Sequence, residues 1–141
     1  MSAFSVSTDV QVRFRDLDAM GHVNNAVYLS YLESARLHYW RLLTQSKNWR
    51  ELDIILARAE VDYRFPATVD MELVVFVRVS ELRGSSFVME YRVEEKGTGR
   101  LVAEARTVQA CYDYAAGRPK RIPDALREGM RALEKPGTVS G

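Results

Sequence analysis

The stretch RDLDAMGHVNNAVY, residues 15–28, is the segment of the chain with the strongest sequence signal. It gathers two carboxylates, an imidazole, two carboxamides and a glycine into one polar segment. Residues 9–15 before it alternate apolar and polar side chains with the two-residue period of a strand. Residues 27–43 after it are apolar with the period of a helix. The sequence therefore predicts a strand, a polar loop and the start of a long helix.

The predicted loop has the composition of a site for acyl transfer. A helix that begins near residues 25–27 leaves its first N–H groups unpaired, and its dipole favours a developing oxyanion there. A carboxylate from Asp16 or Asp18 can attack a carbonyl or activate water toward it. The alternative is structural, because Asp, Asn and Gly are ordinary turn formers and Asn24 or Asn25 can cap the helix.

The order of these residues helps to decide between an acyl-transfer site and a purely structural turn. The segment from Asp16 to Tyr28, followed by YLESAR at residues 31–36, resembles the signature of hotdog-fold thioesterases of the 4-hydroxybenzoyl-CoA thioesterase type. Its HVNN portion, residues 22–25, is also similar to acyl-ACP thioesterases. The match is close around the loop and extends more loosely, by strand order and length, to about residue 115. The resemblance implies an acyl-CoA thioesterase, with an acyl-ACP thioesterase or a non-catalytic acyl-thioester-binding protein as alternatives.

The resemblance also implies roles for individual residues. Asp18, the second Asp of the Asp-x-Asp pair, takes the place of the catalytic carboxylate, as nucleophile or as general base. His22 is the second catalytic candidate, and the backbone N–H of Asn25 falls on the oxyanion donor. Met20 stands where the acyl-ACP enzymes have an Asn. The remaining predicted site residues are Asn24, Gly21 and Tyr28 for oxyanion or substrate binding, and Arg83 with Ser85 for the CoA phosphates.

Composition limits the other possibilities. A chain of 141 residues with 47% hydrophobic content is one globular domain with room for a core. Twenty basic and nineteen acidic residues give a net charge of +1, so no global field favours nucleic acid or an anionic membrane. With one cysteine, Cys111, and two histidines, we expect no disulfide framework, no metal and no organic cofactor. Cys111 is expected to be buried.

The start of the sequence has no basic segment followed by an apolar run, so we predict no secretory signal. The chain has no apolar stretch of the length that spans a bilayer. We therefore expect a cytoplasmic protein.

The rest of the chain predicts a hotdog fold of the α+β class, an antiparallel five-stranded sheet wrapped around a long central helix. The strands are expected at residues 9–15, 54–65, 70–82, 86–95 and 100–114. Glu33 and Arg36 are expected to form an ion pair on the helix. Trp49, in a connection at residues 45–52, is a candidate for a pocket edge or the core. A short helix at residues 124–133 is expected to be capped by Asp124, with residues 133–141 as a flexible tail.

A single sheet of this size leaves exposed faces or edges, so a second copy of the chain is the expected cover. The resemblance implies homodimers, often homotetramers, with active sites at the interface between subunits. For the CoA phosphates, Arg83 lies in a turn that resembles the phosphate-contacting turn of the 4-hydroxybenzoyl-CoA enzyme. The other basic candidates are Arg58, Arg64, Arg118, Lys120 and Arg121.

Overall fold

The computed structural model describes residues 4–45, 48 and 52–135. Trp49, a candidate for a pocket edge, and the end of the predicted tail lie outside these residues. The elements in chain order are β1 (Val6–Gln11), the 3-10 turn η1 (Phe14–Asp16), α1 (Val27–Leu43), β2 (Ile54–Tyr63), β3 (Glu72–Leu82), β4 (Ser86–Glu95), β5 (Leu101–Asp113), β6 (Arg118–Pro119) and α2 (Asp124–Leu133). The predicted long helix and five long strands are confirmed, and β6 adds a short pair to the end of β5.

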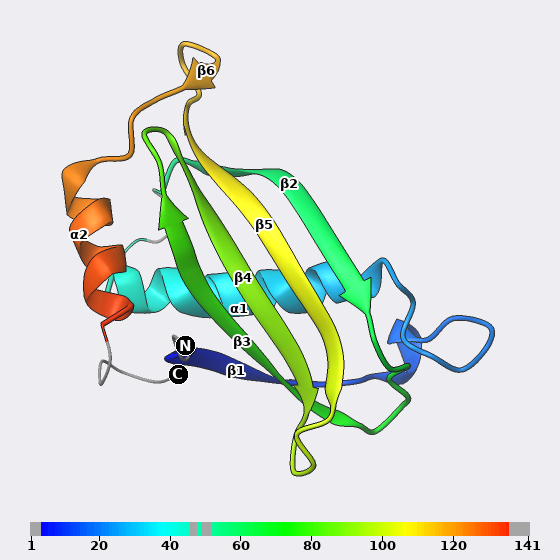
Figure 1. Cartoon of the computed structure of the whole chain (residues 1–141). Helices are drawn as coiled ribbons and strands as arrows, with labels where there is room; N and C mark the ends of the chain where they lie inside the picture. Colours follow the sequence, from blue (N-terminus) through cyan, green and yellow to red (C-terminus); the bar gives the residue numbers. More distant parts are fainter. Residues whose placement is uncertain (1–3, 46–47, 49–51, 136–141) are drawn as a thin grey trace.

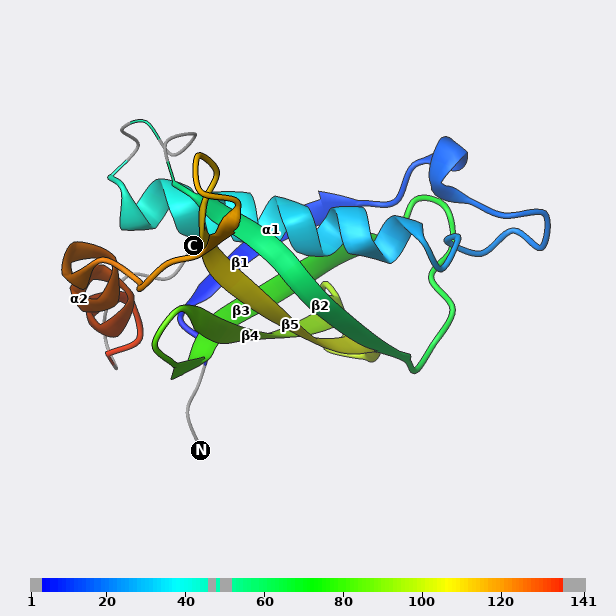
Figure 2. The same cartoon turned by 90° about the horizontal axis from the view of Figure 1, so that it is seen from above.

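The sheet is antiparallel, with the strand order β1-β3-β4-β5-β2. The long helix α1 lies across one face of it, and α2 packs at the end where α1 finishes (Figure 1). Seen from above, the strands form a twisted layer beneath α1 (Figure 2). One helix held by one antiparallel sheet is the hotdog architecture, as the sequence predicts.

The core forms between α1 and the sheet because both present apolar stripes of the right period. Along β3 every second side chain is buried, and the buried residues of β4 pair with them across the strands. The helix contributes Tyr28, Tyr31, Leu32, Ala35 and Tyr39 to the same core. Its other side is more open, since Leu29 keeps 42% of its surface exposed. Burial of one helix stripe fixes α1, so that its N-terminus projects toward the polar loop.

The C-terminal helix is tied to the rest of the domain by one carboxylate. Glu134 Oε2 accepts a hydrogen bond from the Tyr39 hydroxyl at 2.7 Å and another from the Val79 N–H at 2.9 Å. Burial, reinforced by the charge of Glu134, raises the pKa of Tyr39, which therefore remains a donor. Cys111 is buried, as predicted, and its pKa is raised by burial.

Three local predictions are wrong. The first strand ends at Gln11, and the turn η1 leaves Phe14 82% exposed because the chain has already turned away from the sheet. Glu33 does not pair with Arg36 among the described residues, because Arg36 turns inward and donates to the Tyr91 hydroxyl at 3.3 Å. Asp124 is the first residue of α2, and the N-cap is Pro123 with no side-chain hydrogen bond.

The strand β2 forms an edge of the sheet, paired with β5 on one side only. Most of its side chains are exposed, including Leu56 and Tyr63 at 45% and 48%. Unpaired strand edges are templates for another strand, and natural proteins cover or blunt them. Within the described ranges, no helix is both long and apolar enough to cross a bilayer.

Candidate active site

The loop after η1 is a compact turn built around Asp18. Its Oδ1 accepts hydrogen bonds from the backbone N–H groups of Met20 at 2.9 Å and His22 at 3.2 Å. The Asp18 N–H in turn donates to the His22 carbonyl at 2.7 Å. Gly21 closes the turn with φ +84°, a conformation that glycine adopts without steric cost. The carboxylate of Asp18 is thus held in place by the loop while remaining exposed to solvent.

The loop is anchored on the body of the protein next to the start of α1. Val23 is buried, and its N–H donates to the Ala67 carbonyl at 2.9 Å in the connection between β2 and β3. Asn24 donates its N–H to the Asp16 carbonyl at 2.8 Å, which fixes the chain as it enters the helix. In Figure 1 the whole segment stands at the N-terminal end of α1. Loop and helix start therefore form one unit, as predicted.

Four of the eight site residues predicted from the sequence come together around one hollow. A cavity of about 320 Å³ opens at the N-terminus of α1. It is lined by Asp18, His22, Val23, Asn25, Tyr28, Tyr63, Arg64, Phe65 and Pro66. Four of these belong to the site predicted from sequence, and Arg64 is one of the other basic candidates named there. The cavity joins the acidic loop to the helix mouth, the arrangement that the predicted chemistry needs.

The helix mouth offers a free amide. The N-cap position of α1 is Ala26, whose N–H donates to Asn24 Oδ1 at 2.9 Å. Asn24 thus satisfies one backbone donor of the helix start. This role resembles the helix capping by Asn24 or Asn25 that the sequence offered as the structural alternative. The Asn25 N–H is left unpaired, since no described residue accepts a hydrogen bond from it. A backbone donor at a helix N-terminus beside a hollow is suited to bind an oxyanion.

Sequence reasoning missed Tyr63, the last residue of β2. Its hydroxyl donates to the Asn25 carbonyl at 2.9 Å, and its ring meets Tyr28 edge to face at 5.1 Å between centroids. Tyr63 therefore holds the peptide that follows the candidate oxyanion donor. No local pattern connects two positions so far apart in sequence, although a tyrosine just before Arg64 at the end of a strand is a weak signal.

Asp16 has a different role from Asp18. It is only 3% exposed and accepts hydrogen bonds from the Arg13 N–H at 3.0 Å, the Arg13 guanidinium at 3.3 Å and the Tyr31 hydroxyl at 2.7 Å. Burial alone would raise the pKa of Asp16, but these hydrogen bonds outweigh it and hold the pKa below the ordinary value of 3.8. This geometry makes Asp16 a structural residue that shapes the loop and pairs with Arg13.

The predicted phosphate contacts lie elsewhere in the chain. Arg83 is in the turn between β3 and β4, and its Nε donates to Glu81 at 2.6 Å. The Asp18 loop lies beyond the opposite end of β3 (Figure 1). Ser85 belongs to the same distant turn. Within one chain, the structure therefore does not bring Arg83 and Ser85 to the Asp18 cavity, whereas Arg64 lines it.

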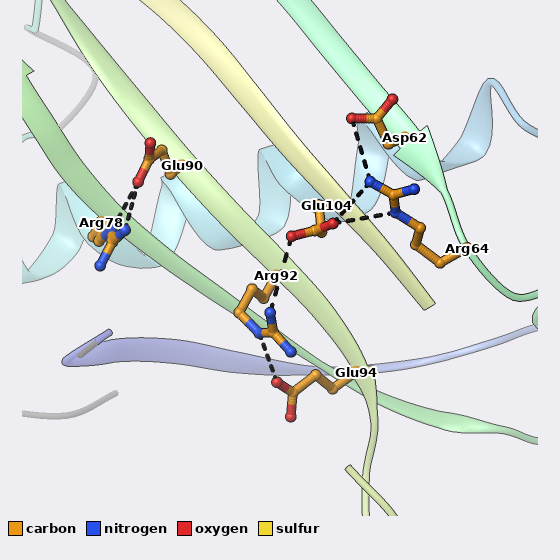
Figure 3. A network of polar contacts seen from close by, with 7 residues as sticks. All are labelled: Asp62, Arg64, Arg78, Glu90, Arg92, Glu94 and Glu104. Carbon is orange, nitrogen blue, oxygen red and sulfur yellow. Dashed lines mark hydrogen bonds and ion pairs between the residues drawn. The ribbon is translucent and has the colours of Figure 1, made fainter. Parts of the chain in front are cut away.

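A larger hollow, about 790 Å³, lies on the sheet face opposite α1. Its charged side chains mostly neutralise one another, as in the 2.7 Å pair between Arg78 and Glu90 and the 2.9 Å pair between Arg92 and Glu94 (Figure 3). Glu104 continues the network. A lining of surface ion pairs provides neither a nucleophile nor a free oxyanion donor. Chemistry therefore favours the smaller cavity at Asp18.

No group of three His, Cys, Asp or Glu residues within the described part of the chain is placed to hold a metal ion. The chemistry available at the Asp18 cavity is that of a carboxylate, an imidazole and backbone amides.

Comparisons with known proteins cover nearly the whole chain. A family model described as the thioesterase-like superfamily matches residues 12–130. The long-chain acyl-CoA thioesterase FadM of Escherichia coli K12 is 27% identical over 135 residues, covering 92% of this chain and 100% of the relative. The acyl-CoA thioesterase YbgC of Haemophilus influenzae is 28% identical over 132 residues, covering 91% and 96%. A thioesterase from Thermus thermophilus, solved with coenzyme A and Zn, is 44% identical with a TM-score of 0.85, covering 95% and 97%.

Proposed function

The chain belongs to the thioesterase-like superfamily, and we propose that it hydrolyses acyl-CoA thioesters to the free acid and CoA. One observation carries the proposal. The Asp18 carboxylate and the start of α1, with the unpaired Asn25 N–H, line the same cavity. A thioester in this cavity would meet an attacking or activating oxygen beside a donor for its carbonyl oxygen. The relatives that act on acyl-CoA support the same reaction.

Asp18 has one oxygen free for the reaction. Oδ1 is occupied by two backbone donors, whereas Oδ2 accepts no hydrogen bond from any described residue. As general base, Oδ2 takes a proton from water while that water attacks the carbonyl carbon. As nucleophile, it forms a mixed anhydride that water then cleaves. Either way the C–S bond breaks, the CoA sulfur receives a proton, and the acid is released.

The donor at the helix start balances the charge that this attack creates. The thioester oxygen becomes negative in the transition state, and the Asn25 N–H with the helix dipole stabilises it. His22 lines the same cavity and can orient water or the thioester. Asn24 acts through the helix start, because its side chain holds the Ala26 N–H.

We propose CoA as the carrier, with Arg64 as the cation beside the cavity for its phosphates. Arg64 lines the cavity, is 52% exposed, and pairs with Glu104 at 3.1 Å. Exposed pairs of this kind are weak and can be exchanged for a phosphate contact. A role for Arg83 in phosphate binding stays a prediction, which would require that turn to approach the cavity from a second copy.

We further propose that a second copy pairs along the edge strand β2. The strand is exposed and unpaired on its outer side within the described chain, and Leu56 and Tyr63 leave apolar surface there. Antiparallel pairing of β2 with its own copy would satisfy this edge with a two-fold symmetric interface. The working form is then a homodimer, or a tetramer of two such dimers, in the cytoplasm.

The test is a panel of acyl-CoA thioesters that vary in chain length and aryl content, with CoA release followed by a thiol-trapping dye. An acyl-ACP assayed in parallel separates the two carriers. We expect hydrolysis of at least one acyl-CoA well above the uncatalysed rate. No release from any member of the panel by the folded protein would contradict the proposal.

A further inference from the structure

A second cavity, about 440 Å³, lies between α1 and the strands β2 and β5. Its apolar wall includes Leu37 and Trp40 of α1 and Leu56 of β2. Four polar side chains also line it: Glu33, Ser34 and Arg36 from α1, and Gln109 from β5. A hollow that combines an apolar wall with a few convergent polar groups has features of a small-molecule site.

Arg36 is a buried cation without an anion. It is 9% exposed and donates to the Tyr91 hydroxyl at 3.3 Å, and no carboxylate of the described residues lies within 4.0 Å of it. Glu33 also lines the cavity, but it is exposed to solvent and does not reach the guanidinium. A buried charge without a counter-charge is costly, so this guanidinium calls for an anionic ligand.

Gln109 is a second unsatisfied group on the same cavity. The residue is 3% exposed, and its Oε1 is buried with no hydrogen-bond partner among the described residues. Buried side-chain polar atoms normally have such a partner. The carboxamide nitrogen of Gln109 can donate to an oxygen of a ligand that Arg36 holds, whereas Oε1 can only accept and would need a donor on the ligand. The charge of Arg36 outweighs the neutral amide in deciding which ligand binds best.

The pairing of β2 proposed above brings this cavity to the reacting thioester. When a strand pairs antiparallel with its own copy about its middle, one end of β2 lies opposite the other end in the second copy. Tyr63 of one copy then lies opposite Ile54 of the other. Tyr63 lines the Asp18 cavity and Ile54 lines the Arg36 cavity. The two hollows therefore adjoin across the interface, with Asp18 from one copy and Arg36 from the other.

We propose that the Arg36 cavity binds the far end of the acyl group and selects acyl groups that carry a carboxylate there. The proposal rests on the function proposed above and names its substrate class. Arg36 forms the ion pair and the side-chain N–H of Gln109 donates to the same carboxylate, while Leu37, Trp40 and Leu56 enclose the chain between the two ends. The reaction itself is unchanged, because these groups contact the acyl end and not the thioester.

The test compares CoA thioesters of equal chain length that end in a carboxylate, a hydroxyl or a methyl group. Lengths from about four to about twelve carbons cover the distances that extended chains of about 1.2 Å per bond can span. We expect kcat/KM for the best carboxylate-ended substrate to exceed that of its methyl-ended counterpart by about tenfold to a hundredfold, the size of a charge-assisted hydrogen bond. The hydroxyl-ended substrate should fall between them.

Variants at the cavity identify the residues responsible. Arg36→Met keeps the length of the side chain and should abolish the preference, so that carboxylate-ended and methyl-ended substrates of equal length have kcat/KM values within about threefold of each other. Arg36→Lys should retain part of the preference, since it keeps the positive charge but loses the planar guanidinium that binds a carboxylate through two hydrogen bonds. Arg41→Met, an exposed position on the same helix, is the matched control and should change nothing. Hydrolysis of the methyl-ended substrate also reports that each variant is folded.

Mixed dimers test the placement of the two cavities. A dimer of one Asp18→Asn copy and one Arg36→Met copy contains one complete site if the sites are shared between copies. Such a dimer should regain the preference for carboxylate-ended substrates that neither parent shows. Equal or better hydrolysis of the methyl-ended or hydroxyl-ended series by the wild type would overturn the substrate assignment. A preference that survives Arg36→Met would overturn the role of Arg36. Both outcomes leave thioester hydrolysis intact, whereas a complete absence of hydrolysis rejects the proposed function itself.

Discussion

Asp16 and Asp18 are two residues apart, yet the structure treats their carboxylates in opposite ways. Asp16 faces inward and is fixed by Arg13 and Tyr31. Asp18 faces outward into the cavity at the start of α1, where only one of its oxygens is occupied. The first carboxylate builds the turn, and the second is left with a free oxygen. A pair of identical side chains in one motif can thus divide structure and chemistry between them.

The comparison predicts its largest effect for Asp18→Asn. The substitution keeps the size and part of the hydrogen bonding but removes the basic oxygen, so kcat should fall at least 100-fold, as for other catalytic groups. Thermal stability should change little, because the side chain is exposed. Acyl-CoA hydrolysis and thermal unfolding measure the two effects. Asp70→Asn is a matched control in an exposed loop, at φ +70° where Asn is tolerated. Activity equal to wild type in Asp18→Asn would reject the assignment.

Asp16→Asn should show the reverse pattern. Loss of a buried charge with three hydrogen bonds should lower the free energy of unfolding at neutral pH by about 2 kcal/mol, and activity should persist where the protein stays folded. Because the pKa of Asp16 is lowered in the folded state, its stabilisation is complete above the ordinary value of 3.8. It is lost as the pH falls through the folded-state value. The difference in stability between wild type and variant should therefore shrink below about pH 3.8, as denaturant unfolding at several pH values can measure.

Tyr31→Phe gives a smaller version of the same effect. It removes one donor to Asp16 and should cost about 1.5 kcal/mol of unfolding free energy, the lower end for a hydrogen bond to a charged group. Chemical denaturation of the single variants and of the double variant with Asp16→Asn gives the coupling between the two side chains. Strict additivity of the two effects would show that this hydrogen bond contributes nothing.

Tyr63→Phe tests whether the hydrogen bond from Tyr63 to the Asn25 carbonyl positions the start of α1 for catalysis. Without its hydroxyl the Asn25 carbonyl is released, and the Asn25 N–H, the proposed oxyanion donor, is held less firmly. We expect kcat to fall about fivefold with little change in KM, corresponding to about 1 kcal/mol of transition-state stabilisation. Tyr114→Phe, at a tyrosine that is 62% exposed, is the matched control. An effect confined to KM would instead place Tyr63 in substrate binding.

Most of the fold could be predicted from the sequence, because the hydrophobic periodicity of a helix or strand is visible within its own residues. The long helix and the strands that follow it are each visible in their own residues, and β4 was predicted with its observed ends. The first strand was placed too late because Phe14 continues an apolar alternation although the chain has already turned. In the candidate site, Asp18, His22, Asn25 and Tyr28 are neighbours in sequence and line one cavity, while their roles stay a prediction.

What the sequence could not supply are contacts between distant segments. Tyr63 approaches Asn25 only because β2 ends beside the start of α1. Arg36 looked like half of an ion pair by its spacing from Glu33, but spacing does not reveal which helix face is buried. The position of Arg83 at the far end of the sheet depends on the direction of β3. Each of these follows from tertiary packing rather than from a local pattern.

The carboxylate of Glu134 joins the last turn of the C-terminal helix to Tyr39 on α1 and to Val79 on β3. A helix held in this way cannot detach alone, because its departure would leave the Tyr39 hydroxyl and the Val79 N–H without a hydrogen-bond acceptor. In native-state hydrogen exchange, α2 and the end of α1 should therefore open as one cooperative unit. The opposite end of α1, next to the Asp18 loop, lies outside this unit, because it is anchored separately through Val23 and Tyr63.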